Sequence, residues 1–338
     1  MGSHRRLAPS GFDRGALCVL SATAAALGAV ATAVPAATAA PHEDTRTEVD
    51  RLYEAAEKAT EAFNEAGERA GTLRRQVGDS QDRIARTQDR VNDLRERLGS
   101  LAGAQYRSGG LDPSLALLFS DDPADYLDKA SVLDRITTHQ AGELKDLQDA
   151  LRELAQERTE ATRKLGDLEK SREAVEKHKR TVEHKLARAR QLLNSLPSAE
   201  RAAFDRASRS GRSGLPVPDG APATGRAGAA LAAARSALGR PYVWGANGPT
   251  GFDCSGLMQW SYAQAGVGLP RTSQAQAHAG RRIPLSQARP GDIVTYRSDA
   301  SHVGMYAGNG QVIHAPYPGA PVRYDPVGMM PVSSVTRP

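Results

Sequence analysis

Three residues in the last quarter of the chain have the types and spacing of a thiol nucleophile with its base. Cys254 follows a turn at Gly251–Asp253 and opens a predicted helix. His302 and His314 lie on two predicted strands, which the tight turn Gly308–Gly310 joins into a hairpin. A helix N-terminus favours a thiolate, an imidazole can take the thiol proton, and a third polar group can orient that imidazole. The pattern indicates nucleophilic attack on a carbonyl, with the backbone N–H of Cys254 as a donor to the oxyanion.

The same three side chains could instead form a zinc site. Zinc in proteins takes four ligands, or three and a water molecule, and Cys254, His302 and His314 contain no closely spaced ligand pair. The sequence therefore favours catalysis, and we expect no metal or cofactor. The other cysteine, Cys18, lies in a predicted signal, so Cys254 would have no disulfide partner. An unpaired thiol in an oxidising compartment indicates that the thiol is reactive and has a function. A buried free cysteine can, however, also be inert packing.

The first forty residues have the pattern of a secretory signal. Arg5, Arg6 and Arg14 form a basic start, and an Ala-rich apolar run from Ala16 to Val30 follows it. Ala37–Ala39 then supplies the small residues of a cleavage site. A retained membrane anchor is the alternative. No later stretch is apolar enough to span a bilayer. We therefore expect residues 1–40 to be a signal peptide and the protein to be secreted and associated with the cell wall.

Charge divides the remaining chain into two parts. Residues 227–338 contain nine Arg, four Asp and no Lys or Glu, a net charge of +5, whereas residues 42–208 carry −4. A basic exported module suits an anionic cell wall. Export also argues against nucleic acid as a partner.

Residues 42–208 have the periodicity of a helical coiled coil. Apolar positions step by three and four from Val49 to Leu101, and a second seam runs from Leu144 to Leu196 with Arg158, Arg172 and Lys179 at core-like positions. The break between the seams predicts an antiparallel hairpin; an extended dimeric coil is the competing geometry. An apolar patch falls at the expected tip of the hairpin: Leu115, Leu117, Leu118 and Phe119.

A Ser/Gly/Pro-rich linker, residues 209–226, separates this region from a folded module at residues 227–338. That module shows two helical patterns, 227–238 and 253–265. Three strand patterns follow them, 292–296, 302–307 and 311–315. The fold class predicted for the module is therefore α+β.

Six motifs of this module, in order, resemble the signature of the NlpC/P60 family. They are Tyr242-Val243-Trp244-Gly245, Gly251-Phe252-Asp253-Cys254-Ser255-Gly256-Leu257, Pro270-Arg271-Thr272-Ser273, Pro290-Gly291-Asp292-Ile293-Val294, His302-Val303-Gly304-Met305-Tyr306 and Val312-Ile313-His314-Ala315. The resemblance covers about 227–338. It implies a papain-like domain that hydrolyses peptidoglycan stem peptides, commonly at the D-γ-glutamyl–diaminopimelate bond.

The same resemblance implies residue roles. Cys254 would be the nucleophile, His302 the general base and His314 the residue that orients it, with Tyr242 near the oxyanion. Four further candidates for substrate binding are Asp253, Ser255, Arg271 and Ser273. For Asp253 and Ser255 the alternative is helix capping. For Arg271 and Ser273 it is a surface loop.

The sequence leaves three functions open: a peptidoglycan endopeptidase, a non-catalytic wall-binding or scaffold protein, and an amidase or acyltransferase on the same fold. The −4 coil could lie over the +5 module and cover its groove, or it could be only a spacer. The coiled coil also resembles helical regulatory regions of some Gram-positive members of the family. That likeness implies a membrane complex of the division or elongation machinery as partner of the exposed apolar tip.

Overall fold

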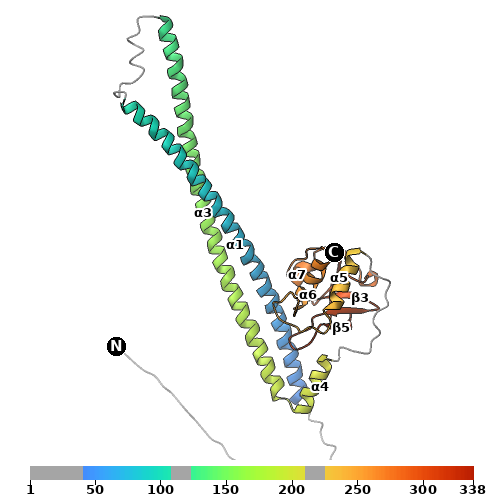
Figure 1. Cartoon of the computed structure of the whole chain (residues 1–338). Coiled ribbons are helices and arrows are strands. Elements are labelled where there is room, and N and C mark those ends of the chain that lie inside the picture. The colour runs from blue at the N-terminus through green and yellow to red at the C-terminus, as the bar shows by residue number, and fades with distance from the viewer. Residues whose placement is uncertain (1–40, 108–122, 210–224) are drawn as a thin grey trace, which may run out of the picture. The chain divides into compact units, whose positions relative to one another are not determined.

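The computed structural model describes residues 41–107, 123–209 and 225–338 (Figure 1). Residues His42–Pro338 form one compact unit. The predicted signal, the apolar tip at 115–119 and most of the predicted linker lie outside the described residues, so those assignments stay predictions. Among the helices that are described, none is both long enough and apolar enough to cross a membrane.

Two long helices, α1 (Pro41–Arg107) and α3 (Pro123–Ser195), lie side by side in opposite directions (Figure 1). The start of α1 packs on the end of α3, where Val49 and Leu52 meet Val182 and Leu186. Further along α1, residues near Val91 pack on the part of α3 near Ala150. The predicted helical hairpin is therefore confirmed, and at 1.5 Å per residue α1 is roughly 100 Å long. The short helix α4 (Ser198–Arg209) follows it.

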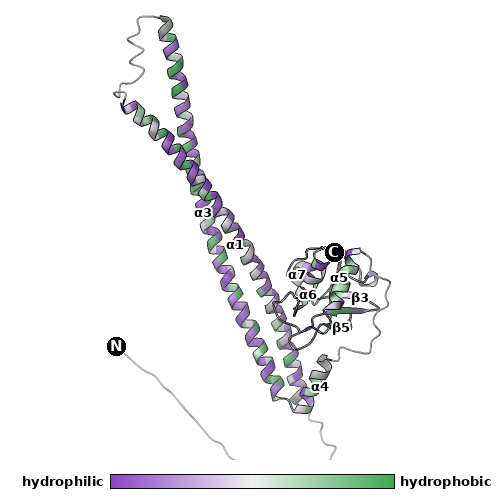
Figure 2. Cartoon of the chain, viewed as in Figure 1, coloured by the Kyte–Doolittle hydropathy of each residue, from purple (hydrophilic) through white to green (hydrophobic). Residues whose placement is uncertain are grey.

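The buried seam of α1 agrees with the sequence, whereas part of the seam predicted for α3 is wrong. Leu144, Leu151 and Leu165 are 50%, 37% and 49% exposed. The buried residues of α3 include three predicted seam positions, Leu154, Ala161 and Leu168, together with Ala150 and Ser171, which the sequence did not assign to the seam. Figure 2 shows hydrophilic and hydrophobic residues interspersed along α3, so several helix faces compete as candidates for the seam.

The charged residues assigned to the second seam do not interrupt the helix contact. Arg158, Arg172 and Lys179 are all exposed. Arg158 reaches across to α1, where its Nη2 donates to the side-chain oxygen of Gln88 over 2.9 Å. The expectation that these charges lie in the core is therefore wrong. Their long side chains extend from the edge of the helix contact into solvent.

The C-terminal domain, residues 225–338, contains three helices, a short 3₁₀ turn and one six-stranded antiparallel sheet. The helices are α5 (Gly225–Ser236), α6 (Cys254–Gln264) and α7 (Ser273–Gln276), and the turn is η1 (Leu285–Gln287). The strands are β1 (Arg281–Ile283), β2 (Ile293–Tyr296), β3 (His302–Gly308), β4 (Gln311–His314), β5 (Arg323–Pro326) and β6 (Val332–Arg337), in the order β1-β6-β2-β3-β4-β5. The predicted α+β class is confirmed, and β1, β5 and β6 are strands that the sequence analysis did not assign.

Alternating residues of the central strands serve two cores. Ile293, Val303 and Met305 pack against apolar residues of α5 and α6. Val294 and Tyr296 join a second cluster with Val335. Such period-two alternation is what a strand buried on both faces requires.

The N-terminus of α6 is built around Asp253 and Gly256. Asp253 is the N-cap, and its carboxylate accepts a hydrogen bond of 2.6 Å from the backbone N–H of Gly256. A Cβ on Gly256 would collide with the backbone oxygen of Ala246 and with the Asp253 carboxylate. The close approach of the preceding loop therefore holds the first turn of α6, and with it Cys254, in place.

We expect Gly256→Ala to destabilise the protein by about 1–3 kcal/mol, because the added methyl group has no room and must push the loop or the cap aside. Urea unfolding followed by tryptophan fluorescence measures the change, since Trp244 and Trp260 both belong to this domain. Gly268→Ala is the matched control, since no atom lies within 4 Å of a Cβ built there. Equal stability of the two variants would contradict this account of α6.

Candidate active site

The fold brings Cys254, His302 and His314 together. Sγ of Cys254 and a ring nitrogen of His302 lie within 4.8 Å of each other. Nε2 of His302 is 2.8 Å from Nδ1 of His314. All three side chains are at most 1% exposed. The structure thus places a buried thiol beside a pair of hydrogen-bonded imidazoles, as the sequence predicted.

The pairing of the histidines depends on the hairpin of β3 and β4. Met305 pairs with Ile313, and the antiparallel register therefore continues with Gly304 opposite His314. His302 lies two residues before Gly304, on the same face of β3. A Cβ at position 304 would lie 3.1 Å from Cβ of His314. The glycine leaves the space in which the two rings meet.

Asp325 of β5 extends this chain of side chains and was not among the predicted site residues. Its Oδ2 lies 2.8 Å from Nε2 of His314 and accepts a hydrogen bond of 2.8 Å from Nε of Arg323. Burial lowers the pKa of His314 to about 4, although Asp325 opposes this shift, so His314 is neutral near pH 7. The alternation Arg323-Tyr324-Asp325 was the available sequence signal, but it has meaning only once β5 is known to pair with β4.

The predicted substrate-binding residues form one buried cluster at the start of α6. Nη1 and Nη2 of Arg271 donate to the two carboxylate oxygens of Asp253 over 3.0 and 2.5 Å. Nη1 of Arg271 also donates to Oγ of Ser255 over 2.9 Å. Arg271 and Ser273 are 7% and 0% exposed, so the surface-loop alternative is wrong for both. Asp253 is a helix cap, as the alternative proposed, and at the same time the partner of Arg271.

Tyr242 lies close to the thiol. It pairs with Phe252 in a short parallel bridge, two residues before Cys254. Burial raises the pKa of the Tyr242 hydroxyl well above its ordinary value, and the Cys254 thiolate would raise it further. The hydroxyl is therefore a proton-bearing group, as a donor to an oxyanion must be.

Helix α1 adds side chains that sequence reasoning did not assign to the site. Oε1 of Glu57 lies 2.7 Å from Nδ1 of His302, and its other oxygen accepts from Nη1 of Arg297 over 2.8 Å. Nδ2 of Asn64 donates to Asp253 over 3.1 Å. Glu57 is 3% exposed and Asn64 4%. Helix α1 therefore occupies Nδ1 of His302, the ring nitrogen that does not contact His314.

Glu61, one turn after Glu57, fills the neighbouring part of the site. Its carboxylate accepts from Oγ of Ser255 over 2.7 Å and from the backbone N–H of Ser273 over 2.8 Å. The thiol of Cys254 donates to the same carboxylate at a sulfur–oxygen distance of 3.5 Å. Two carboxylates of α1 thus flank the thiol of Cys254, which is 1% exposed.

These contacts determine the protonation of the site. Burial raises the pKa of the Cys254 thiol well above its ordinary value, and the charges of Glu61, Glu57 and Asp253 raise it further. Burial, followed by the charge of Asp253, raises the pKa of Glu61 to about 7. Burial would raise the pKa of Glu57 as well, but His302 and Arg297 hold it below its ordinary value. The expected thiolate is therefore disfavoured while α1 is in place, since an anion would join a cluster of carboxylates.

Among the described residues, Glu57, Cys254 and His302 have ligand atoms close enough for a metal ion, within 4.8 Å of one another. This set differs from the cysteine and two histidines considered in the sequence. Its members already satisfy one another or their neighbours by hydrogen bonds, with Glu57 bound to His302 and Arg297. The donor set does not call for a metal ion.

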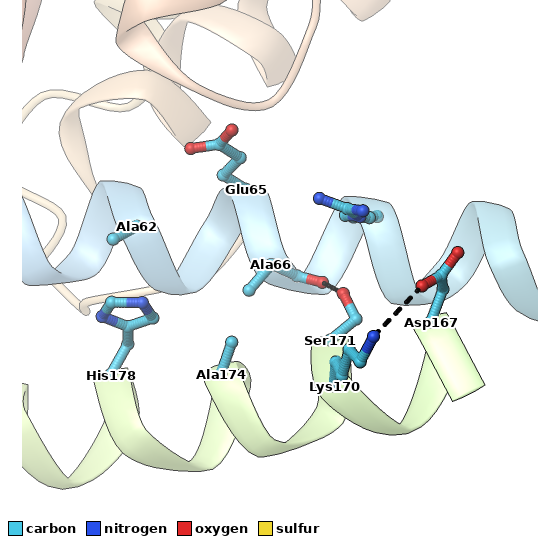
Figure 3. Close-up of a pocket in the computed structure, with 9 residues that line it drawn as sticks. Ala62, Glu65, Ala66, Asp167, Lys170, Ser171, Ala174 and His178 are labelled. Carbon is cyan, nitrogen blue, oxygen red and sulfur yellow. Dashed lines mark hydrogen bonds and ion pairs between the residues drawn. The ribbon is translucent and has the colours of Figure 1, made fainter. Parts of the chain in front are cut away.

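A groove of about 310 Å³ lies between α1 and α3 (Figure 3). Small side chains line it where the helices approach, and Oγ of Ser171 donates across the gap to the carbonyl oxygen of Ala66 over 3.1 Å. Its lining contains none of Cys254, His302 and His314. We interpret it as a notch in the packing of the hairpin.

Comparison with known proteins identifies the C-terminal domain. A model of the NlpC/P60 family matches residues 239–335. A probable endopeptidase of Mycobacterium tuberculosis is 49% identical over 119 residues, which are 35% of this chain and 30% of that protein. A probable endopeptidase of Corynebacterium glutamicum is 47% identical over 122 residues, 36% of this chain and 58% of that protein. The chain thus spans less than two thirds of these curated relatives.

Solved structures give the same match. The P60 domain of an antigen of M. avium subspecies paratuberculosis is 39% identical, with 33% of this chain and 93% of that chain covered and a TM-score of 0.32. The NlpC/p60 domain of the peptidoglycan hydrolase SagA is 36% identical, with 33% of this chain and 98% of that chain covered and a TM-score of 0.32.

We expect Cys254 to react with iodoacetamide only at a higher pH than an ordinary cysteine, because burial and the neighbouring carboxylates raise its pKa. Glu57→Gln and Glu61→Gln should each move the pH profile of alkylation downward, since each removes a negative charge beside the thiol. Mass spectrometry of the labelled peptide measures the rate. Glu68→Gln, an exposed change on the same helix, is the control. A profile typical of a free cysteine in the unchanged protein would disprove this electrostatic account.

Proposed function

Because the chain belongs to the NlpC/P60 family through its C-terminal domain, we propose that the protein is a secreted cysteine peptidase that hydrolyses peptidoglycan stem peptides. The observation that carries the proposal is the buried line from Cys254 through His302 to His314. A scaffold protein has no need to bury two hydrogen-bonded histidines beside a thiol. The basic character of residues 227–338 suits the anionic wall polymer.

The geometry supports a two-step acyl transfer. Nδ1 of His302 takes the proton of Cys254, and Sγ attacks the scissile carbonyl to form a tetrahedral intermediate. The backbone N–H of Cys254 and the hydroxyl of Tyr242 stabilise its oxyanion. As the intermediate collapses, His302 gives its proton to the leaving amine and a thioester remains. Water, activated by His302, then hydrolyses the thioester and regenerates the thiol.

The contacts of Glu61 support cleavage of a substrate bond that lies next to a free carboxylate of the substrate. Its side chain is bound by Ser255 and by the backbone N–H of Ser273, 3.5 Å from the thiol. In this position the Glu61 carboxylate stands in for an acidic group of the substrate. A D-glutamyl residue linked through its γ-carboxyl keeps its α-carboxylate free beside the scissile bond. This chemistry favours the D-γ-glutamyl–diaminopimelate bond over an amide without a neighbouring acid.

We further propose that the hairpin restrains the peptidase. Glu57 occupies Nδ1 of His302, Glu61 occupies the carboxylate site, and Cys254 is only 1% exposed. Further contacts at the edge hold α1 in place: Tyr53 stacks on Tyr317 with ring centroids 5.0 Å apart, and Nζ of Lys58 lies 3.1 Å from Asp299. Substrate can therefore reach the thiol only when α1 moves away. A helix that served only as a spacer would not block the site in this way.

We expect Cys254→Ala to abolish cleavage of purified muropeptides, because it removes the nucleophile and little volume. His302→Ala should lower kcat/KM by about 10²–10⁴-fold through loss of the general base. His314→Ala should cost less, since it removes only the orienting group. Mass spectrometry of the products identifies the bond and separates endopeptidase from amidase or transferase chemistry. Cleavage by the Cys254→Ala protein would rule out a cysteine peptidase, and a larger loss with His314→Ala would reverse the two roles.

We expect the double variant Glu57→Lys/Glu61→Lys to hydrolyse muropeptides faster than the unchanged protein. The new ammonium groups would meet Arg297, Arg271 and His302, and this repulsion favours the open state. Initial rates with a soluble muropeptide measure the effect. Glu68→Lys/Glu96→Lys, two exposed changes of the same charge on α1, is the control. Equal rates for all three proteins would exclude restraint and leave the hairpin as a spacer or docking arm.

A further inference from the structure

We infer that Asp325 is a positioning residue of this peptidase, which sets the tautomers of His314 and His302 and so decides which nitrogen of His302 faces the thiol. The inference rests on the proposed function and adds a fourth member to its Cys254–His302–His314 line. The residue lies on β5, next to the histidine strand β4, with which it pairs through Val312. Its carboxylate reaches His314 but not the thiol or the substrate site.

The direction of the hydrogen bonds follows from the chemistry of the carboxylate. An ionised carboxyl group has acceptors only. Burial would raise the pKa of Asp325, but His314 and Arg323 hold it below its ordinary value, so the group is ionised. Its Oδ2 lies 2.8 Å from Nε2 of His314. That nitrogen must therefore carry a proton and donate.

The proton on Nε2 of His314 decides the state of the other nitrogens. His314 is neutral because burial lowers its pKa to about 4, so its Nδ1 has a lone pair and accepts. Nε2 of His302, 2.8 Å away, is consequently the donor of that bond. When His302 is neutral, its Nδ1 is then free of a proton and can act as the base for Cys254. Without an acceptor at position 325, His314 could carry its proton on Nδ1 and donate it to Nε2 of His302. A neutral His302 would then carry its own proton on Nδ1 and could not take the proton of the thiol.

The contact between Glu57 of α1 and His302 is consistent with these positions of the protons. Glu57 is ionised, and its Oε1 lies 2.7 Å from Nδ1 of His302, which must therefore donate. With Nε2 also donating to His314, His302 is an imidazolium ion in the restrained state. It has no lone pair with which to take the thiol proton. Departure of α1 removes the acceptor that holds this proton on Nδ1 of His302.

The competing interpretation is that Asp325 serves only as a structural ion pair for Arg323, whose guanidinium also lies over the ring of Tyr317 at 5.7 Å. The two roles differ in what each substitution does. Both contacts of Asp325 use the same oxygen, Oδ2. An amide oxygen placed there accepts from both partners, whereas an aliphatic side chain accepts from neither.

The test compares Asp325→Asn with Asp325→Leu in the full chain carrying Glu57→Lys/Glu61→Lys, because in the restrained state the donor Nε2 of His302 by itself keeps the proton of His314 on Nε2. The ¹⁵N chemical shifts of the imidazoles, assigned with His302→Gln and His314→Gln, report the tautomers directly. We expect His314 to carry its proton on Nε2 in this background with Asp325 or with Asp325→Asn, and to lose this preference with Asp325→Leu. In the Glu57→Lys/Glu61→Lys background, Asp325→Leu should lower kcat on a muropeptide by about 10- to 100-fold, the loss seen for outer-shell partners of metal-bound histidines. Its KM should not change, and Asp325→Asn should restore most of the rate.

Two further variants make the result decisive. Arg337→Leu breaks the equivalent aspartate–arginine pair at Asp292 and touches neither histidine, so it should leave the tautomers unchanged. If circular dichroism shows that Asp325→Leu does not fold, Asp325→Ala removes the same acceptor with less steric demand. An Nε2-protonated His314 in the leucine or alanine variant, or equal losses with asparagine and leucine, would overturn the inference. The imidazole spectra do not depend on the substrate, so failure to cleave muropeptides would count against the proposed function alone.

Discussion

A single line of hydrogen bonds, from Glu57 through His302 and His314 to Asp325, holds the site together. It joins α1 to three successive strands of the sheet, and its members are almost completely buried apart from Asp325. A buried polar group without a partner costs on the order of 1–3 kcal/mol, so each member requires the next. The sheet register, the glycine at position 304 and the position of α1 all follow from the need to complete this line.

Charge balance explains why α1 can enter the site at all. Three buried carboxylates, those of Glu57, Glu61 and Asp253, lie around one thiol. Within the described part of the chain, two arginines, Arg271 and Arg297, hydrogen-bond to these carboxylates. The remaining imbalance is met by a proton on His302 and by the raised pKa of Glu61, about 7. Above pH 7 Glu61 must be charged in the closed state, whose stability relative to the open state is then smaller than at pH 5.

Two faces of helix α1 pack against other parts of the protein. Val49, Leu52 and Ala56 face α3, whereas Glu57, Glu61 and Asn64 form a second stripe of nearly the same period that faces the C-terminal domain. The periodicity of apolar residues finds the first stripe. It cannot distinguish the second from a solvated face, because acidic residues three and four apart on a helix are usually exposed.

The sequence by itself indicated the two long helices, three of the six strands and the candidate reactive groups. Heptad spacing favoured a helical hairpin, and alternation and turns favoured strands. Cys254 at a helix start, with His302 and His314 on a hairpin, indicated the candidate reactive groups. What it could not determine were contacts between residues far apart in the chain. Glu57 and His302 are separated by 245 positions, and Asp325 lies on a strand whose weak pattern and partial burial left it unassigned. The register of α3 was likewise decided by packing, because its apolar residues lie on several faces and only the fit of Ala150 and Ala161 against α1 selects one. Local patterns depend on near neighbours, whereas a buried charge depends on whichever distant group is brought beside it, and only the tertiary structure decides that.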